Sequence, residues 1–345
     1  MKYAVLAFEE IMIKAKREIT VEELVTKQAW KNCKLGDRLQ KITAIIVPHP
    51  QFTHALEKIE ERRVKVQTQS KGSAISVVAA TGGGKTTLAT KIQALNPDIH
   101  TKELTLRKAV YFSVPPRPSS AAMSSAVLEA LGDPCWDKGK ADALAKRAIH
   151  LLKECQTEII LMDNTHDIPE RRKIKGVREV GNWVRDIIDS VPALFVSLGA
   201  EQGLDVFKAN SQTRRRSPAT VRIDYFNCTN PKGVSRLRRF LLELDILLPL
   251  AEMSNLSDFE TTKRIWIATN GIPDYIMNLM TEALEYAVMD NREQITWEDL
   301  RKGMISLFED ACPADLNPFS PSAKNIRLLD QAGEPFEAWL DDGFE

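Results

Sequence analysis

One short run of residues is suited to binding phosphate groups. Residues 79–87 read Ala-Ala-Thr-Gly-Gly-Gly-Lys-Thr-Thr, between an apolar run over residues 75–78 and a helical pattern over residues 88–95. Strand, Gly-rich loop and helix in this order are typical of a P-loop, which holds the phosphates of a nucleotide. Glycines let backbone N–H groups turn toward phosphate oxygens, and the helix adds its positive N-terminal end. The context disfavours the alternative, a Gly-rich turn without a ligand.

The side chains of this run predict ATP and Mg²⁺ as cofactors. Lys85 supplies a positive charge for the β- and γ-phosphates, and Thr86 supplies a hydroxyl for Mg²⁺. Ala79 stands where the first glycine of such a loop is usual, and alanine serves there if its backbone stays in an ordinary conformation. The predicted nucleotide-binding residues are Thr81, Gly82, Gly83, Gly84, Lys85, Thr86 and Thr87.

A second run ends in a carboxylate that suits the same metal ion. The four apolar residues 159–162 predict a strand buried on both faces, and Asp163 follows at its C-terminal end. Ligands of open α/β sheets bind outside this end of the strands. We therefore predict Thr86 and Asp163 as the Mg²⁺ ligands, the alternative for Asp163 being the cap of a turn.

The next residue bears on the rate of hydrolysis. Asn164 stands where many ATPases have a glutamate that polarises the attacking water. An amide orients water but cannot accept its proton, which leaves His166 and Asp167 as further candidates for the base. The sequence thus supports ATP binding better than fast hydrolysis.

Bulk composition restricts the class of protein. The chain of 345 residues has room for one large domain or two moderate ones, and no apolar stretch reaches the length of a membrane span. Its 5 cysteines are scattered, without a CxxC pair, which argues against a disulfide framework or a zinc site and for the cytoplasm. The formal net charge is zero, so any DNA-binding surface has to be a local patch.

Periodicity divides the chain into an α/β part and a helical part. Strand patterns over residues 75–78, 109–114, 158–163, 193–197 and 221–226 alternate with helices, which predicts a parallel, doubly wound sheet. From Gly233 onward, amphipathic helices follow one another without a strand, which predicts a small helical lid. The expected divisions are an N-terminal extension (1–50), a P-loop domain (51–232), a lid (233–312) and an acidic tail (313–345).

Several segments resemble one family of ATPases. A P-loop α/β domain followed by a helical lid resembles the AAA+ ATPases, and particular segments are similar to the TniB/TnsC-type ATPases of DNA transposition. The most specific is Leu-Leu-Pro-Leu-Ala-Glu-Met-Ser-Asn-Leu at 247–256. Further ones are Met-Asp-Asn-Thr-His at 162–166, Thr-Asn-Gly-Ile-Pro at 269–273, Ala-Leu-Glu-Tyr-Ala at 283–287, Ile-Thr-Trp-Glu-Asp-Leu at 295–300 and Asn-Pro-Phe at 317–319. The resemblance covers roughly residues 45–320.

The resemblance implies an activity and partners. Members bind ATP, assemble as rings or helical filaments on double-stranded DNA, and mark a target for a transposase, together with a target-selection protein of the TniQ type. Arg216, with Arg214 second, resembles the arginine finger that reaches the neighbour's γ-phosphate, although a solvated basic run is the alternative. Ser197 would be the polar sensor at the end of the fourth strand. Slow hydrolysis is expected from Asn164, and also because residues 272–275 lack the arginine that many AAA+ lids have there.

The resemblance also implies that DNA contacts come from the inner face of the ring, on segments after the second strand and near the ATPase strands. The expected contacts are Arg117, Lys138, Lys140, Arg171 and Lys173. A helicase loader or replication initiator shares the AAA+ architecture and stays open as the second hypothesis. A small-molecule kinase is a third.

The acidic tail, from about residue 325 to 345, carries scattered aromatic residues. Too few apolar residues are present to build a core, so we expect this tail to be mobile and to dock on a basic surface of the transposase. A solubilising end is the alternative. The apolar residues concerned are Phe336, Trp339, Leu340 and Phe344.

Overall fold

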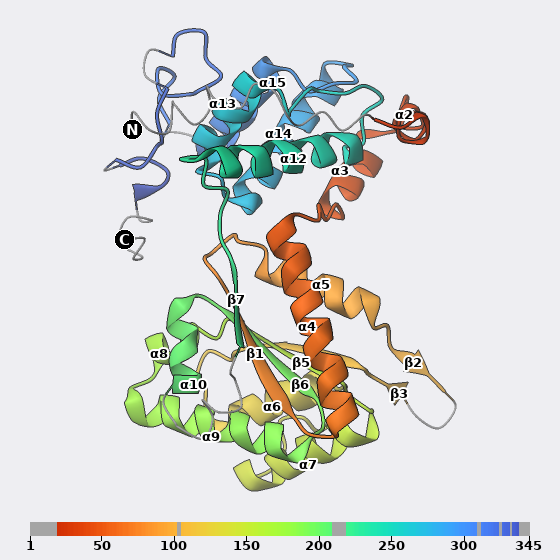
Figure 1. Ribbon diagram of the computed structural model, residues 1–345, viewed down its shortest axis with the longest axis vertical. Helices are drawn as coiled ribbons and strands as arrows, with labels where there is room; N and C mark the ends of the chain where they lie inside the picture. Colours follow the sequence, from red (N-terminus) through yellow and green to blue (C-terminus); the bar gives the residue numbers. More distant parts are fainter. Residues whose placement is uncertain are drawn as a thin grey trace. The chain divides into compact units, whose positions relative to one another are not determined.

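The computed structural model describes residues 19–101, 105–208, 219–308, 312–323, 326–331 and 333–337 (Figure 1). Contacts divide the chain into two compact units. The α/β unit is a continuous segment, residues 51–224, whereas the helical unit combines residues up to Pro50 with residues from Tyr225 onward.

A five-stranded parallel sheet forms the centre of the α/β unit. Its strands are β1 (Ser73–Ala79), β4 (Ala109–Ser113), β5 (Ile159–Asp163), β6 (Leu194–Gly199) and β7 (Ala219–Ile223), in the order β4-β5-β6-β1-β7. The predicted strands and the predicted doubly wound class are confirmed. The short antiparallel pair of β2 (Ile99–His100) and β3 (Thr105–Leu106) was not predicted.

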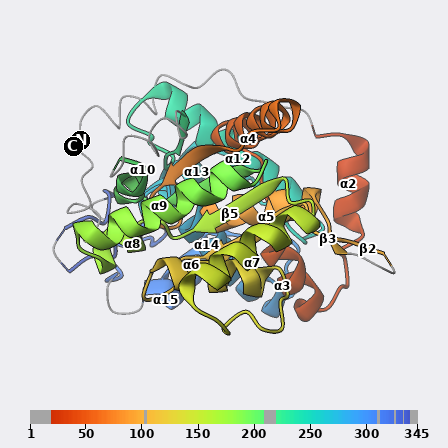
Figure 2. The same ribbon diagram turned by 90° about the horizontal axis from the view of Figure 1, so that it is seen from below.

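Helices cover both faces of this sheet because alternate strand residues are apolar on both sides. Ile160 belongs to a core that contains Met123 of α6 (Ser120–Ala130), Leu144 of α7 (Ala141–Glu154) and Val180 of α9 (Ile174–Ser190) (Figure 2). Its neighbour Ile159 faces the other way and lines a hollow between α4 (Pro50–Gln69) and α5 (Lys85–Leu95). Short helices α8 (Asp167–Arg171), η1 (Glu201–Leu204) and α10 (Asp205–Lys208) follow strands β5 and β6.

The helical unit contains the predicted lid helices and two more helices from the N-terminal side. They are α2 (Val21–Gln28), α3 (Leu35–Thr43), α12 (Pro231–Leu247), α13 (Phe259–Thr269), α14 (Pro273–Met289) and α15 (Trp297–Phe308). The predicted apolar stripes are buried, as Leu241 of α12 and Leu284 of α14 show at 0% exposure. Among the described residues, no helix is both long enough and apolar enough to cross a membrane.

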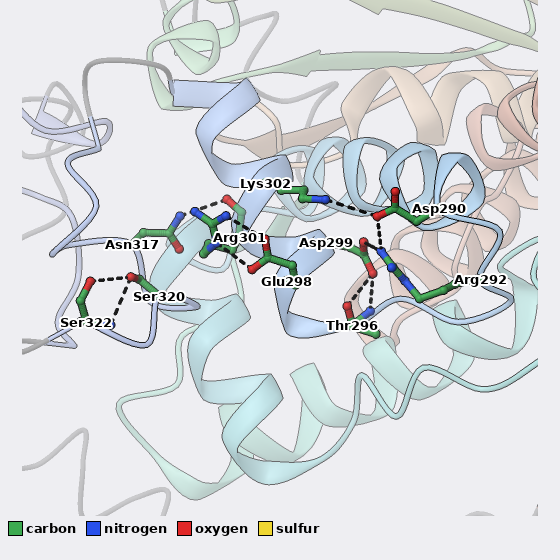
Figure 3. A network of polar contacts seen from close by, with 10 residues as sticks. All are labelled: Asp290, Arg292, Thr296, Glu298, Asp299, Arg301, Lys302, Asn317, Ser320 and Ser322. Carbon is green, nitrogen blue, oxygen red and sulfur yellow. Dashed lines mark hydrogen bonds and ion pairs between the residues drawn. The ribbon is translucent and has the colours of Figure 1, made fainter.

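Charged side chains fasten α15 to α14 at the start of α15 (Figure 3). The buried carboxylate of Asp299 accepts hydrogen bonds from the backbone N–H of Thr296, at 2.8 Å, and from its hydroxyl, at 2.7 Å. This arrangement caps the helix N-terminus. Arg292 pairs with Asp299 and also with Asp290, so the turn between the two helices is held from both sides.

Residues 19–50, the described part of the N-terminal extension proposed over residues 1–50, pack with the helical unit. Two buried cations explain this. The ammonium of Lys27 donates to the carbonyl oxygens of Asp245 (2.7 Å) and Leu248 (3.3 Å). These carbonyls lie at the C-terminal end of α12, where backbone oxygens accept no hydrogen bond from within the helix. The guanidinium of Arg38 makes two 2.8 Å hydrogen bonds to the carboxylate of Glu293.

Part of the C-terminal tail also packs on the helical unit, so the expectation of a mobile tail is wrong there. We call residues 312–323, 326–331 and 333–337 the strap. The ring of Phe336 is fully buried, with its centroid 5.2 Å from that of Tyr275 and 5.7 Å from that of Phe308. The strap builds no core of its own, but its apolar residues complete an existing one. Trp339, Leu340 and Phe344 lie outside the described residues.

The Asn-Pro-Phe segment fastens the strap. Asn317 is buried, and its side-chain amide donates to the carbonyl oxygen of Arg301 at 3.1 Å (Figure 3). Its side-chain oxygen accepts from the N–H of Phe319 at 3.0 Å. The guanidinium of Arg264, in α13, donates to the carbonyl oxygen of Pro318 in the strap. Internal packing therefore explains a motif that the sequence presented only as a family resemblance.

Candidate nucleotide site

The loop between β1 and α5 has the backbone of a phosphate-binding loop. Gly82 and Gly84 have φ of 73° and 86°, in the left-handed region that favours glycine. Ala79 is the last residue of β1, in ordinary extended conformation, which explains why alanine serves in place of the first glycine. The helix α5 starts at Lys85, so its positive N-terminal end faces the loop.

The ammonium of Lys85 is held at this loop. It donates to the carbonyl oxygens of Ala79 (2.7 Å) and Ala80 (2.8 Å), and the residue is only 8% exposed. Burial lowers the pKa of Lys85, and the charge of Asp163 opposes that shift. A nearly buried cation at the loop supplies positive charge where a polyphosphate would bind.

Asp163 lies beside Thr86, as predicted. The Thr86 hydroxyl donates to Oδ2 of Asp163 at 3.1 Å, and the carboxylate is 1% exposed. The backbone N–H of Asn164 donates to Oδ1 at 2.7 Å. A hydroxyl and one carboxylate are hard oxygen donors that fit Mg²⁺, which is commonly held by few protein ligands and by substrate phosphates. The described residues contain no cluster of three or more His, Cys, Asp or Glu side chains that would hold a metal by protein ligands alone.

A tyrosine that the sequence reasoning missed also binds this carboxylate. The Tyr111 hydroxyl donates to Oδ2 of Asp163 at 3.0 Å. Burial, followed by the charge of Asp163 and this hydrogen bond, raises the pKa of Tyr111 to about 12, so the phenol keeps the proton it donates. Tyr111 lies two residues before the end of β4, and its contact with Asp163 depends on the register of β4 against β5.

The side chain of Asn164 has a fixed orientation. The residue has φ of 59°, a left-handed conformation that asparagine tolerates, and its Nδ2 donates to the Ser113 hydroxyl at 2.9 Å. Ser113 is the register partner of Asp163 across β4 and β5. With Nδ2 engaged, Oδ1 is the atom of the amide that can accept a hydrogen bond from water.

The two further candidates for the base are joined to each other. His166 Nε2 lies 3.6 Å from Oδ1 of Asp167, and Oδ2 of Asp167 lies 2.7 Å from Arg171. The carboxylate of Asp167 is thus already paired with a cation.

Ser197 does not end its strand, which corrects the prediction. The strand β6 continues to Gly199, and Ser197 is 3% exposed, with its hydroxyl donating to that of Ser76 in β1 at 3.1 Å. The sheet interior therefore holds this side chain. Thr165, in the loop after β5, instead joins this loop to β6, because its N–H and its hydroxyl both donate to the carbonyl of Leu198. Arg214 and Arg216 lie outside the described residues.

The five predicted DNA contacts fall into two groups. Arg117 follows β4 at the edge of the sheet where Asp163 lies. A hydrogen bond from the N–H of Ser120 to Glu179 (3.0 Å) joins this loop to α9. Around the start of α9 lies a basic hollow of about 410 Å³, lined by Arg171, Arg172, Lys173, Lys175, Gly176 and Glu179.

The other two belong to the loop between α6 and α7. The carbonyl of Lys138 accepts a hydrogen bond from Arg147 of α7 at 3.2 Å, so this loop lies against α7. Lys140 directly precedes the first residue of α7.

The fold and this site together define a P-loop ATPase of the AAA+ class. The *Aeropyrum pernix* ORC2 protein in its ADPNP–ADP complexes superimposes with a TM-score of 0.56 at 14% identity, over 78% of this chain and 71% of that one. Cdc6p from *Pyrobaculum aerophilum* superimposes with a TM-score of 0.54 at 16% identity, over 76% and 69% of the two chains. The A. pernix ORC1 protein in complex with DNA superimposes with a TM-score of 0.51 at 14% identity, over 80% of this chain and 70% of that one. At these identities the likeness establishes the fold alone.

The model of the bacterial TniB protein family matches residues 38–222. The chain belongs to this family of transposition-associated AAA+ ATPases, which confirms the resemblance noted in the sequence. A comparison with curated proteins finds no match.

Proposed function

We propose that this protein is an ATP-dependent regulator that oligomerises on target double-stranded DNA and recruits or activates a transposase. The observation that carries the proposal is the 3.1 Å contact between Thr86 and Asp163 beside the buried Lys85, in a chain of the TniB family. A transposase and a target-selection protein of the TniQ type are the proposed partners, and DNA as a ligand places the activity in the bacterial cytoplasm.

In this proposal, Lys85 and residues 81–87 bind the phosphates of ATP, and Thr86 with Asp163 holds Mg²⁺, which would neutralise phosphate charge. Hydrolysis is slow because Asn164 Oδ1 orients water without taking its proton. Slow turnover prolongs the ATP-bound state, which suits a protein that marks a site.

Assembly would couple neighbouring subunits through an arginine. Arg216, or Arg214 as second candidate, is proposed to reach the γ-phosphate bound by the next subunit, which would make ATP binding and oligomerisation one event. The ring or helical filament on DNA follows from head-to-tail contacts of this kind.

The proposed DNA surface consists of Arg117 and the basic hollow at the start of α9, including Arg171 and Lys173. Its cations would contact backbone phosphates, which gives salt-sensitive binding with little sequence preference. Lys138 and Lys140, in the loop between α6 and α7, are a second group of proposed contacts.

The test is binding to plain duplex DNA with a non-hydrolysable ATP analogue, followed by anisotropy and electron microscopy. Nucleotide-dependent filaments or rings are expected, and Lys85→Ala should abolish both nucleotide binding and assembly. Charge reversal at Lys173 should weaken DNA binding and reduce the slope of log affinity against log salt by about one. Charge reversal at Lys138 tests the second group separately, and an unchanged slope there would exclude Lys138 from the surface. Assembly that ignores nucleotide would overturn the proposal.

A helicase loader or replication initiator is the second candidate, because the ORC and Cdc6 proteins share the fold. Direct capture of the cognate transposase by the nucleotide-bound protein separates the two. DNA-stimulated ATP turnover separates both from a small-molecule kinase.

A further inference from the structure

One carboxylate oxygen of Asp163 accepts hydrogen bonds from two hydroxyl groups, which belong to different elements of the fold. Thr86, at the start of α5, donates to Oδ2 at 3.1 Å, and Tyr111, in β4, donates to the same atom at 3.0 Å. The register pairs Tyr111 with Leu161 and Ser113 with Asp163, so the phenol reaches two residues along the neighbouring strand to meet the carboxylate. Packing alone does not require this reach, since Tyr111 is only half-buried.

The two oxygens of the carboxylate are fixed by different means. The backbone N–H of Asn164 holds Oδ1 at 2.7 Å. Thr86 cannot hold Oδ2 equally firmly once its oxygen serves a metal ion, because its position then follows the metal. Tyr111 comes from the sheet and depends on neither the loop nor the ligand. It is therefore the donor that keeps the plane of the carboxylate from rotating about the Cβ–Cγ bond.

We propose that Tyr111 is a positioning residue for the metal site, which sets the carboxylate of Asp163 in the orientation that Mg²⁺ requires. The inference rests on the proposed Mg²⁺ site of Thr86 and Asp163. Groups that orient a metal ligand contribute to metal affinity because the ligand needs no reorganisation when the ion binds. Tyr111 itself is not assigned as a ligand, since its proton is engaged with Asp163.

The experiment measures the affinity for a non-hydrolysable ATP analogue by calorimetry, with Mg²⁺ and with EDTA. The ratio of the two affinities gives the enhancement by Mg²⁺, and no catalytic turnover is involved. Tyr111→Phe removes only the hydroxyl and keeps the ring. We expect the enhancement by Mg²⁺ to be roughly tenfold smaller in this variant. Its affinity in EDTA and its thermal unfolding temperature should equal those of the unchanged protein.

Two controls define the interpretation. Tyr286→Phe removes a hydroxyl that is hydrogen-bonded at 2.8 Å to Ser306 in the helical unit, and it should leave the enhancement unchanged. In an Asp163→Asn background, Tyr111→Phe should have little further effect, because the two residues act through one contact.

The remaining outcomes are decisive. Full Mg²⁺ enhancement in Tyr111→Phe would overturn the proposal and leave the proposed metal site intact. An equal loss of affinity with Mg²⁺ and with EDTA would also overturn it, since that result indicates a packing role at the loop. If the unchanged protein shows no enhancement by Mg²⁺, the metal site of Thr86 and Asp163 fails, and the role of Tyr111 fails with it.

Discussion

The side-chain amide of Asn164 donates a 2.9 Å hydrogen bond to the Ser113 hydroxyl, across the two strands that end beside the P-loop. This contact decides which end of the amide is engaged. The nitrogen is turned to the neighbouring strand, and the oxygen is the end that can meet water. The residue thus has the orientation of a water-positioning group but lacks the basicity of a carboxylate.

We predict that Asn164→Glu raises the rate of ATP hydrolysis by at least roughly tenfold, because a carboxylate accepts the proton of the attacking water. Steady-state phosphate release with DNA present measures the effect. Ser113→Ala is the companion variant and should lower the basal rate, since it releases the amide from its orientation. Unchanged or lower turnover in Asn164→Glu would locate the base elsewhere, with His166 and Asp167 to be substituted next.

Arg216→Ala should leave nucleotide binding by the monomer nearly intact while weakening subunit association and hydrolysis together, because a finger acts on the neighbour's site. Nucleotide titration at low protein concentration and sedimentation with DNA check the two properties. Arg214→Ala is the matched variant and should have the smaller effect. Loss of nucleotide binding in the monomer would show that the arginine triplet is structural.

The strap changes how the C-terminal tail has to be tested. Truncation after Pro321 would remove the buried Leu329 and Phe336, so it would damage the core of the helical unit. Phe336→Ala should by itself cost about 3–5 kcal/mol of unfolding free energy, the usual range for a fully buried phenylalanine. Denaturant unfolding of the variant measures this, and a cost below about 1 kcal/mol would contradict the packing of Phe336 against Tyr275 and Phe308.

A chain cut after Glu337 removes the acidic, aromatic end and keeps the strap. We predict that this chain retains ATP-dependent DNA binding and loses capture of the transposase, whose basic surface suits acidic residues flanked by aromatic ones. Pull-down with the transposase, compared with the full chain, is the measurement. Undiminished capture would assign these last residues to solubility.

The helical unit should lose stability between about pH 6.5 and pH 4 in part through His49. Burial, followed by the charge of Arg236, lowers the pKa of His49 to about 4, and its ring packs against Phe226 and Phe240. An unfolded histidine binds its proton below about pH 6.5, so in this window the unfolded chain holds up to one proton more than the folded chain. The free energy of unfolding therefore decreases as the pH decreases, by up to about 3 kcal/mol. His49→Gln should flatten the dependence of unfolding free energy on pH. An identical slope in both proteins would show that His49 is not the group responsible.

Local patterns predicted the α/β unit because its motifs are contiguous. The P-loop and the apolar strand before Asp163 each fit within a few residues, and sheet topology then brings Thr86 and Asp163 together. Tyr111 and Ser113 were not identified, because their role depends on strand register, which a single sequence does not display. Ser197 was placed at the wrong point because its strand extends two residues further, to Gly199.

The helical unit was harder to predict because its contacts span the whole chain. Lys27 and Arg38 read as ordinary surface cations until the carbonyls of α12 and the carboxylate of Glu293 are placed beside them. Phe336 likewise reads as part of a mobile acidic tail until Tyr275 and Phe308 surround it. Charge and polarity along the chain do not display these long-range contacts.

The construction of the helical unit from both ends of the chain has a consequence for synthesis. Residues 51–224 are contiguous, so the α/β unit can fold while the ribosome is still adding later residues. The helical unit has to wait, because its core is incomplete until Phe336 has left the exit tunnel. The segment of α2 and α3 is made first, and it has no surface to dock on until α12 and Glu293 have emerged. Nascent chains should therefore pass through a stage in which the nucleotide-binding half is formed and the remainder needs protection from aggregation.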